Sequence, residues 1–186
     1  MQRGWTTFVG TLCRAGDEDR APKFFRALNM FGAKGTMADL DDGAAQIPLD
    51  EDEVRATISS MVPREHFDLI LTHAPNGEYT RHLRHEEVSR CVFRMWTQGE
   101  LQSRELWQFA YDDDEGRQLP LPENDADIFM DLSNEVWAKK RDVLTQIYGF
   151  GPQSWEVQTN PRREAFWRLL VPDDLRVCLE RRRVRS

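Results

Sequence analysis

The chain has 186 residues, of which 40% are hydrophobic and 31% are charged, as in an ordinary globular protein. This length can bury a sizeable core, and we expect one domain over residues 1–186. The net charge of −7 argues against a nucleic-acid partner. No apolar stretch approaches the roughly 20 residues that cross a bilayer, and no signal peptide is visible. Three widely separated cysteines favour reduced thiols, which are typical of a cytoplasmic protein. We therefore expect a cytoplasmic protein, and from the lack of a long apolar stretch we expect no membrane span.

Strands and helices are predicted to alternate along the first half of the chain. The β-branched and aromatic residues of 5–12 favour a strand. Asp50 and Glu53 form a capping-box pattern, which commonly begins a helix. The expected elements are a strand at 5–12, a helix between Asp19 and Gly32, a strand at 36–40, a helix from Asp50 to Pro63, and a strand at 67–72.

The second half continues the alternation. The expected elements are a helix with apolar residues between 88 and 96, a strand at 105–111, an acidic surface loop at 112–126, a short strand at 127–131, a helix from Ser133 to Gly149, and a short final helix opened by Pro161. Such alternation predicts βαβ units, a mainly parallel sheet and helices on both of its faces, which is an α/β fold.

A loop with two histidines, Gly77 to His85, follows the strand at 67–72 and opens into a helix. Open α/β folds build their sites at the carboxyl ends of strands. His82 and His85 are three residues apart, so both side chains can face one site, and neutral imidazole is a common metal ligand. The same spacing is also typical of surface or capping histidines, and the sequence leaves both interpretations open.

Other side chains of this loop have two interpretations each. Tyr79 could donate a hydrogen bond to an oxyanion or only pack its ring over the loop. Glu78 and Arg81 could bind a substrate or be solvated charges. His73 ends the strand and could face the site, although a lone histidine is more often structural.

A second candidate region is the polar loop after the first strand. If the first strand belongs to the same sheet, Arg14, Asp17 and Arg20 would open on the same edge as the histidine loop and could help bind a substrate. Acidic residues are also favoured at a helix N-terminus, and capping explains at least one of those at 17–19.

Four stretches together resemble the LmbE-like deacetylase family, which includes the GlcNAc-phosphatidylinositol de-N-acetylases (PIG-L). They are Thr11-Leu12-Cys13-Arg14-Ala15-Gly16-Asp17, the helix-to-strand passage from Phe31 to Gly43, the histidine motif from Thr72 to His85, and the late helix from Lys139 to Phe150. They span nearly the whole chain, and the histidine motif is the most specific of them.

The resemblance implies a Rossmann-like three-layer α/β sandwich and a zinc-dependent hydrolase. Such an enzyme removes an acyl group from an amine, often on an N-acetylated amino sugar or glycoconjugate. By the resemblance, His85 ligates zinc, His82 assists the tetrahedral intermediate, and Tyr79 contributes to the oxyanion site.

The chain departs from the family pattern in two places. A His-Pro-Asp-Asp-Glu-type motif, which in the family supplies two zinc ligands and the general base, is not found, and the chain begins at the counterpart of the family's second strand. Arg84 stands where many relatives carry an aspartate. We therefore expect an N-terminally incomplete deacetylase domain that lacks the first strand, has an incomplete zinc shell, and is unstable or homo-oligomeric by itself.

Two alternatives remain. The chain could be a degenerate relative that binds a sugar without hydrolysing it. Its metal site could also be completed by another protomer or by local carboxylates such as Asp17, which predicts zinc binding that is lost in His85→Ala.

Overall fold

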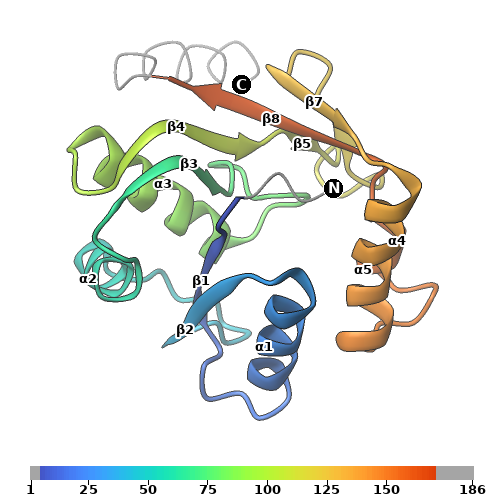
Figure 1. The fold of residues 1–186 in the computed structure, drawn as a ribbon, viewed down its shortest axis with the longest axis horizontal. Helices are drawn as coiled ribbons and strands as arrows, with labels where there is room; N and C mark the ends of the chain where they lie inside the picture. Colours follow the sequence, from blue (N-terminus) through green and yellow to red (C-terminus); the bar gives the residue numbers. More distant parts are fainter. Residues whose placement is uncertain (1–4, 171–186) are drawn as a thin grey trace. The chain divides into compact units, whose positions relative to one another are not determined.

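The computed structural model describes residues 5–170, and strands and helices both occur throughout this range. The chain divides into two compact units (Figure 1). The described part of the first unit comprises 5–63 and 132–162, and that of the second comprises 64–131 and 163–170.

The first unit is built on a pair of parallel strands. Its elements are β1 (Phe8–Cys13), α1 (Arg20–Phe31), β2 (Lys34–Leu40), α2 (Glu51–Met61), α4 (Asn134–Asp142), the π-helical segment η1 (Val143–Ile147) and α5 (Trp155–Gln158). Phe24 and Leu28 of α1 are buried, and Gly32 ends this helix in the left-handed conformation at φ 63°. The Asp50 side chain caps α2 by accepting from the backbone amides of Asp52 and Glu53, as the capping-box pattern predicts.

The second unit contains a four-stranded sheet. Its elements are β3 (His66–Thr72), α3 (Leu83–Thr97), β4 (Gln102–Phe109), β5 (Tyr111–Asp112), β6 (Leu121–Pro122), β7 (Ile128–Asp131) and β8 (Arg163–Leu169). The sheet has the order β3-β4-β8-β7, with β3 parallel to β4 and β8 antiparallel to both of its neighbours. Helix α3 packs on β3 and β4 (Figure 1). Its buried Cys91 and Met95, together with Leu106 of β4 and Phe166 of β8, belong to the core.

The predicted final helix after Pro161 is wrong, because residues 163–169 form strand β8. Short apolar runs such as Ala165 to Trp167 do not distinguish a helix from a buried strand. Pairing with β4 on one side and β7 on the other satisfies the backbone of this segment, so tertiary contacts decide its conformation. The predicted loop at 112–126 also contains β6, which pairs with β5.

The α/β class is confirmed in this general form. The sheets are small, and the four-stranded sheet is mixed, so a mainly parallel Rossmann-like sandwich stays a prediction. Strands β1 and β3 belong to different hydrogen-bonded sheets. The strand at 127–131 and the helix after Ser133 are confirmed, although the latter continues as the π-helical η1.

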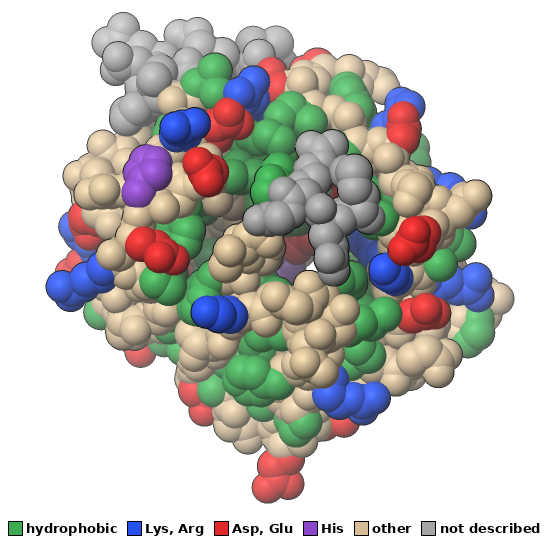
Figure 2. Space-filling view, viewed as in Figure 1, with side chains coloured by type: hydrophobic (Ala, Val, Ile, Leu, Met, Phe, Trp, Pro, Cys, Tyr) green, Lys and Arg blue, Asp and Glu red, His purple; other side chains and the backbone are tan. Residues whose placement is uncertain are grey.

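The surface carries both signs of charge. On the face drawn in Figure 2, basic and acidic side chains of the described residues are interspersed. Within residues 5–170, no helix is both long and apolar enough to cross a membrane. Cys13 and Cys91 are free thiols, as expected, and Cys178 lies outside the described residues.

Candidate metal centre

A tight turn follows β3 and reverses the chain. Ala74 and Gly77 form an antiparallel bridge in which each backbone amide donates to the other's carbonyl, at 2.7 and 3.0 Å. Pro75 and Asn76 occupy the two central positions, which are positions where these residues favour a turn. Gly77 has φ +105°, and a Cβ atom there would lie 2.0 Å from the Thr80 carbonyl oxygen. Only glycine fits this turn without strain.

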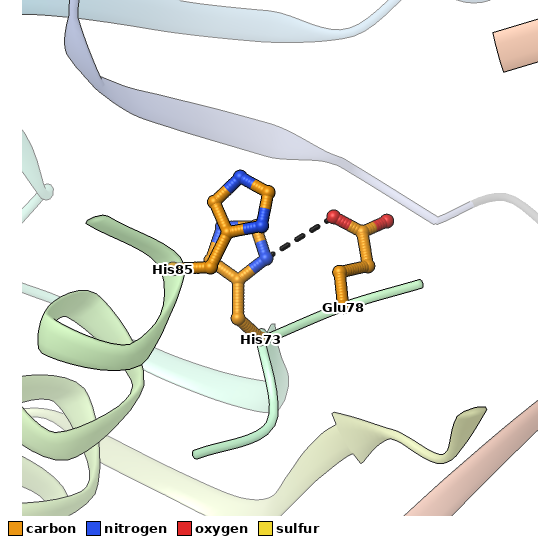
Figure 3. Close-up of side chains that lie close together, drawn as sticks. All are labelled: His73, Glu78 and His85. Atoms are coloured by element: carbon orange, nitrogen blue, oxygen red, sulfur yellow. Dashed lines mark ion pairs between the residues drawn. The ribbon is translucent and has the colours of Figure 1, made fainter. Parts of the chain in front are cut away.

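The turn places His73 and Glu78 opposite each other, because they are the residues that directly flank the bridged pair (Figure 3). Nδ1 of His73 lies 3.1 Å from a carboxylate oxygen of Glu78, and both side chains are about one quarter exposed, at 26% and 24%. This nitrogen is itself shielded from solvent and makes no hydrogen bond to the described residues. The two atoms therefore lie close together without a well-aligned hydrogen bond.

His85 reaches the same place from the first turn of α3. Its ring stacks on that of His73, with centroids 3.9 Å apart and planes 4° from parallel (Figure 3). His82 occupies the N-cap of this helix with an extended backbone, and its ring lies 4.8 Å from that of His85. The strand end, the turn and the helix start thus bring three of the four histidines together.

The donor set of His73, Glu78 and His85 fits a divalent metal ion. One ligand atom of each residue lies within 4.8 Å of those of the other two. Two imidazoles and one carboxylate are a known ligand set of catalytic zinc, which leaves a fourth position for water. The structure supports a metal site here and does not specify which metal.

Tyr79, which follows Glu78 directly, is held by a carboxylate from a distant strand. Its hydroxyl donates to Oε2 of Glu164 on β8 at 3.2 Å, and the Tyr111 hydroxyl donates to the same oxygen at 2.6 Å. The two tyrosine rings meet edge to face at 4.6 Å. Burial, reinforced by the charge of Glu164, raises the pKa of both tyrosines, so they remain protonated hydrogen-bond donors.

Arg84, which departs from the family pattern, is buried beside the site. It is 4% exposed and forms an ion pair with Glu87, one turn further along α3, which is 9% exposed. The guanidinium and the carboxylate neutralise each other inside the protein, where a lone charge would be costly. Arg84 therefore has a structural partner on its own helix.

The other predicted substrate-binding residues also have partners. Arg81 donates to both carboxylate oxygens of Glu86, at 3.0 and 3.4 Å, and its side chain is largely exposed. This ion pair raises the pKa of the Arg81 guanidinium, which stays charged at any relevant pH. Arg81 lies next to His82 and retains most of its surface for a ligand.

Arg14, Asp17 and Arg20 belong to the first unit, and each makes contacts there. Arg14 pairs with Asp42 at 3.0 Å and with Asp17 at 3.3 Å. Asp17 Oδ1 accepts from the backbone amides of Asp19 and Arg20, so Asp17 caps α1, while Asp19 at the N-cap position makes no side-chain capping bond. These amides, with Arg14, lower the pKa of Asp17. The guanidinium of Arg20 lies over two aromatic rings, 5.8 and 5.3 Å from the centroids of Tyr148 and Phe150.

The structure thus brings His73, at the end of β3, together with four residues of the histidine loop: Glu78, Tyr79, His82 and His85. The sequence predicts a substrate contact or a solvated charge for Glu78, and leaves His73 open between the site and a structural role. In the structure, one possible ligand atom of each lies within 4.8 Å of one of His85. The turn residues Pro75, Asn76 and Gly77 were the available signal, because a two-residue reversal makes the flanking residues neighbours. No local sequence pattern around Glu164 or Tyr111 predicts that these residues form hydrogen bonds in a network with Tyr79.

The comparisons with known proteins are sparse. No family model and no curated protein matches the sequence. The structure is similar to the crystal structure of GalB, the 4-carboxy-2-hydroxymuconate hydratase from Pseudomonas putida KT2440. The TM-score is 0.59, the sequence identity is 14%, and the match covers 90% of this chain and 85% of that chain. At this identity, the likeness concerns the fold alone.

Proposed function

We propose that this chain is a metal-dependent hydrolase with a Rossmann-like α/β fold that removes an N-acyl group from an amino sugar or glycoconjugate. The observation that carries the proposal is the proximity of His73, Glu78 and His85, whose possible ligand atoms all lie within 4.8 Å of one another. The reaction class and the preference for zinc rest on the resemblance of the histidine motif to the LmbE-like deacetylases. The three candidate ligands all come from this chain, and the local carboxylate among them is Glu78 instead of the expected Asp17.

A divalent ion bound there would lower the pKa of a coordinated water and polarise a carbonyl oxygen. The chain's own residues would supply the remaining functions. His82, next to His85, is the residue positioned to exchange a proton with the reacting groups. Arg81, next to His82, offers an exposed positive charge for an anionic or polar substrate. Tyr79 would have to leave Glu164 before it could donate to an oxyanion.

The fold likeness to GalB favours a second candidate, the addition of water to an unsaturated acid. Both reactions need an activated water and a proton-transfer group, so the same residues serve either one. The two candidates differ in their substrates and products, which makes them separable by experiment.

The first experiment measures zinc per chain in the purified protein by elemental analysis, beside the variants His85→Ala and His66→Ala. His66 begins β3, is exposed and lies outside the cluster, so it is a matched histidine control. We expect near-stoichiometric zinc in the wild type and in His66→Ala, and a loss in His85→Ala. Equal zinc contents in all three proteins, or none in the zinc-supplemented wild type, would contradict the site.

The second experiment compares two substrates on the zinc-loaded protein. Acetate release from N-acetylglucosamine that requires His82 supports the deacetylase. Water addition to 4-carboxy-2-hydroxymuconate, without acetate release from N-acetyl sugars, supports the hydratase instead. Saturable binding of the sugar to metal-free protein, with no turnover of either compound, would identify a non-catalytic sugar-binding relative.

A further inference from the structure

Two separate constraints fix the backbone on either side of Glu78. Before it, Gly77 is hydrogen-bonded to Ala74 across the turn. After it, the Tyr79 hydroxyl is bonded to Glu164. Glu78 is therefore the central residue of a three-residue span whose two ends are anchored to different parts of the second unit.

Glu164 is well suited to act as an anchor because it lies on a rigid element. Strand β8 pairs with β4 on one side and β7 on the other, and Ala165 and Phe166, which follow Glu164, are buried. Glu164 itself is opposite Met130 in the ladder with β7. The carboxylate therefore has a fixed position relative to the sheet that also contains β3.

The Glu164 carboxylate is an acceptor shared by two tyrosine hydroxyl groups. One oxygen of Glu164 accepts two hydroxyl groups, and the 2.6 Å bond from Tyr111 has the length of a charge-assisted hydrogen bond. Tyr111 is 3% exposed, so its hydroxyl fixes the carboxylate from the buried side. Tyr79 then completes the network from the loop side.

We propose that Glu164 is a positioning residue for the metal centre, which holds the Glu78 ligand in place through Tyr79. This inference rests on the proposed metal site and adds to it a residue far away in the sequence. In metal sites generally, residues that orient the ligands affect affinity by about 10–100-fold. On this interpretation Tyr79 serves first as the link between Glu164 and the ligand loop.

Cobalt(II) titration of the metal-stripped, full-length chain tests the proposal, with the visible absorbance of bound cobalt as the readout. We expect Glu164→Ala to weaken cobalt binding about 10–100-fold, and Glu164→Gln, which keeps an acceptor, to weaken it by less than about tenfold. Tyr79→Phe, which keeps the ring and removes the hydroxyl, should match Glu164→Ala. The control is Asp131→Ala, since Asp131 on neighbouring β7 pairs with exposed Arg163 and its removal should leave the affinity unchanged.

Thermal melts of the metal-free variants give a second measurement, and the titrations are made below the lowest melting temperature so that folded proteins are compared. Cobalt affinities of Glu164→Ala and Tyr79→Phe within about twofold of the wild type would overturn the positioning role. A wild type that binds no cobalt would overturn the metal site and this inference together. Weakened binding in these variants, with no N-acyl hydrolysis by the wild type, would support the inference and refute only the proposed reaction.

Discussion

The rings of His73 and His85 are stacked, with centroids 3.9 Å apart and planes 4° from parallel. One ring comes from the residue that follows β3 and the other from the first turn of α3, so the contact joins the end of this strand to the start of this helix. With Glu78 beside His73, one possible ligand atom of each of these three residues lies within 4.8 Å of those of the other two. This relationship leads to the first prediction.

Zinc should stabilise the folded protein through Glu78 as well as through the histidines. A ligand that binds only the folded state at about 100 times its dissociation constant adds about 2.7 kcal/mol to the free energy of unfolding. We expect a higher melting temperature with zinc than with a chelator, and no such difference in Glu78→Gln. Glu86→Gln is the control, since Glu86 pairs with Arg81 outside the donor cluster. A full zinc response in Glu78→Gln would show that Glu78 is not a ligand.

Gly77→Ala should destabilise the protein and weaken the metal site. The added Cβ would meet the Thr80 carbonyl oxygen at 2.0 Å, and φ +105° is unfavourable for alanine. Gly99→Ala is a matched control, because Gly99 also has positive φ, at +77°, but has open space around it. Chemical denaturation should show a loss of about 1 kcal/mol for the control and a clearly larger loss for Gly77→Ala. Equal losses would mean that the turn relaxes without strain.

High pH should unfold the protein through its tyrosines. The sequence has three tyrosines. Burial raises the pKa of Tyr79, Tyr111 and Tyr148 above the ordinary 10.0, with Glu164 adding to the effect at the first two. Below that pH both the folded and unfolded states keep the phenol protons. Above it the unfolded state loses them first, so the free energy of unfolding falls by about 1.4 kcal/mol per pH unit for each such tyrosine.

The measurement is tyrosinate absorbance followed together with circular dichroism. Tyrosinate should appear only as the secondary structure is lost, and Tyr111→Phe should show a shallower dependence of stability on pH. Complete ionisation near pH 10 with the fold intact would contradict the raised pKa values.

Breaking the buried ion pair of Arg84 and Glu87 should be costly. Arg84→Met would leave the Glu87 carboxylate buried without its cation, which typically costs about 3–5 kcal/mol. The double variant Arg84→Met, Glu87→Leu should recover part of this loss, because neither member of the pair is then buried without the other. Urea unfolding of the single and double variants measures both effects. A double variant no more stable than the single one would show that the pair does not act as a unit.

The sequence alone determined most of the local elements and the position of the histidine loop. The apolar strand before Thr72 and the amphipathic helix after His82 have clear periodicities, and the i, i+3 spacing of His82 and His85 follows from helix geometry. Capping by Asp50 and Ser133 was also predictable, because a capping side chain bonds to amides two or three residues away. These features depend on neighbours in the chain.

Only the tertiary structure decided which distant side chains contact each other and which strands pair. His73 and Glu78 meet across a turn, Tyr79 meets Glu164 at a sequence separation of 85 residues, and 163–169 becomes a strand because two other strands pair with it. Such contacts leave no periodic pattern, since the free energy that selects them comes from burial and hydrogen bonds to distant segments. The sequence therefore locates the histidine loop, and the fold brings His73, Glu78 and His85 together and bonds Tyr79 to Glu164.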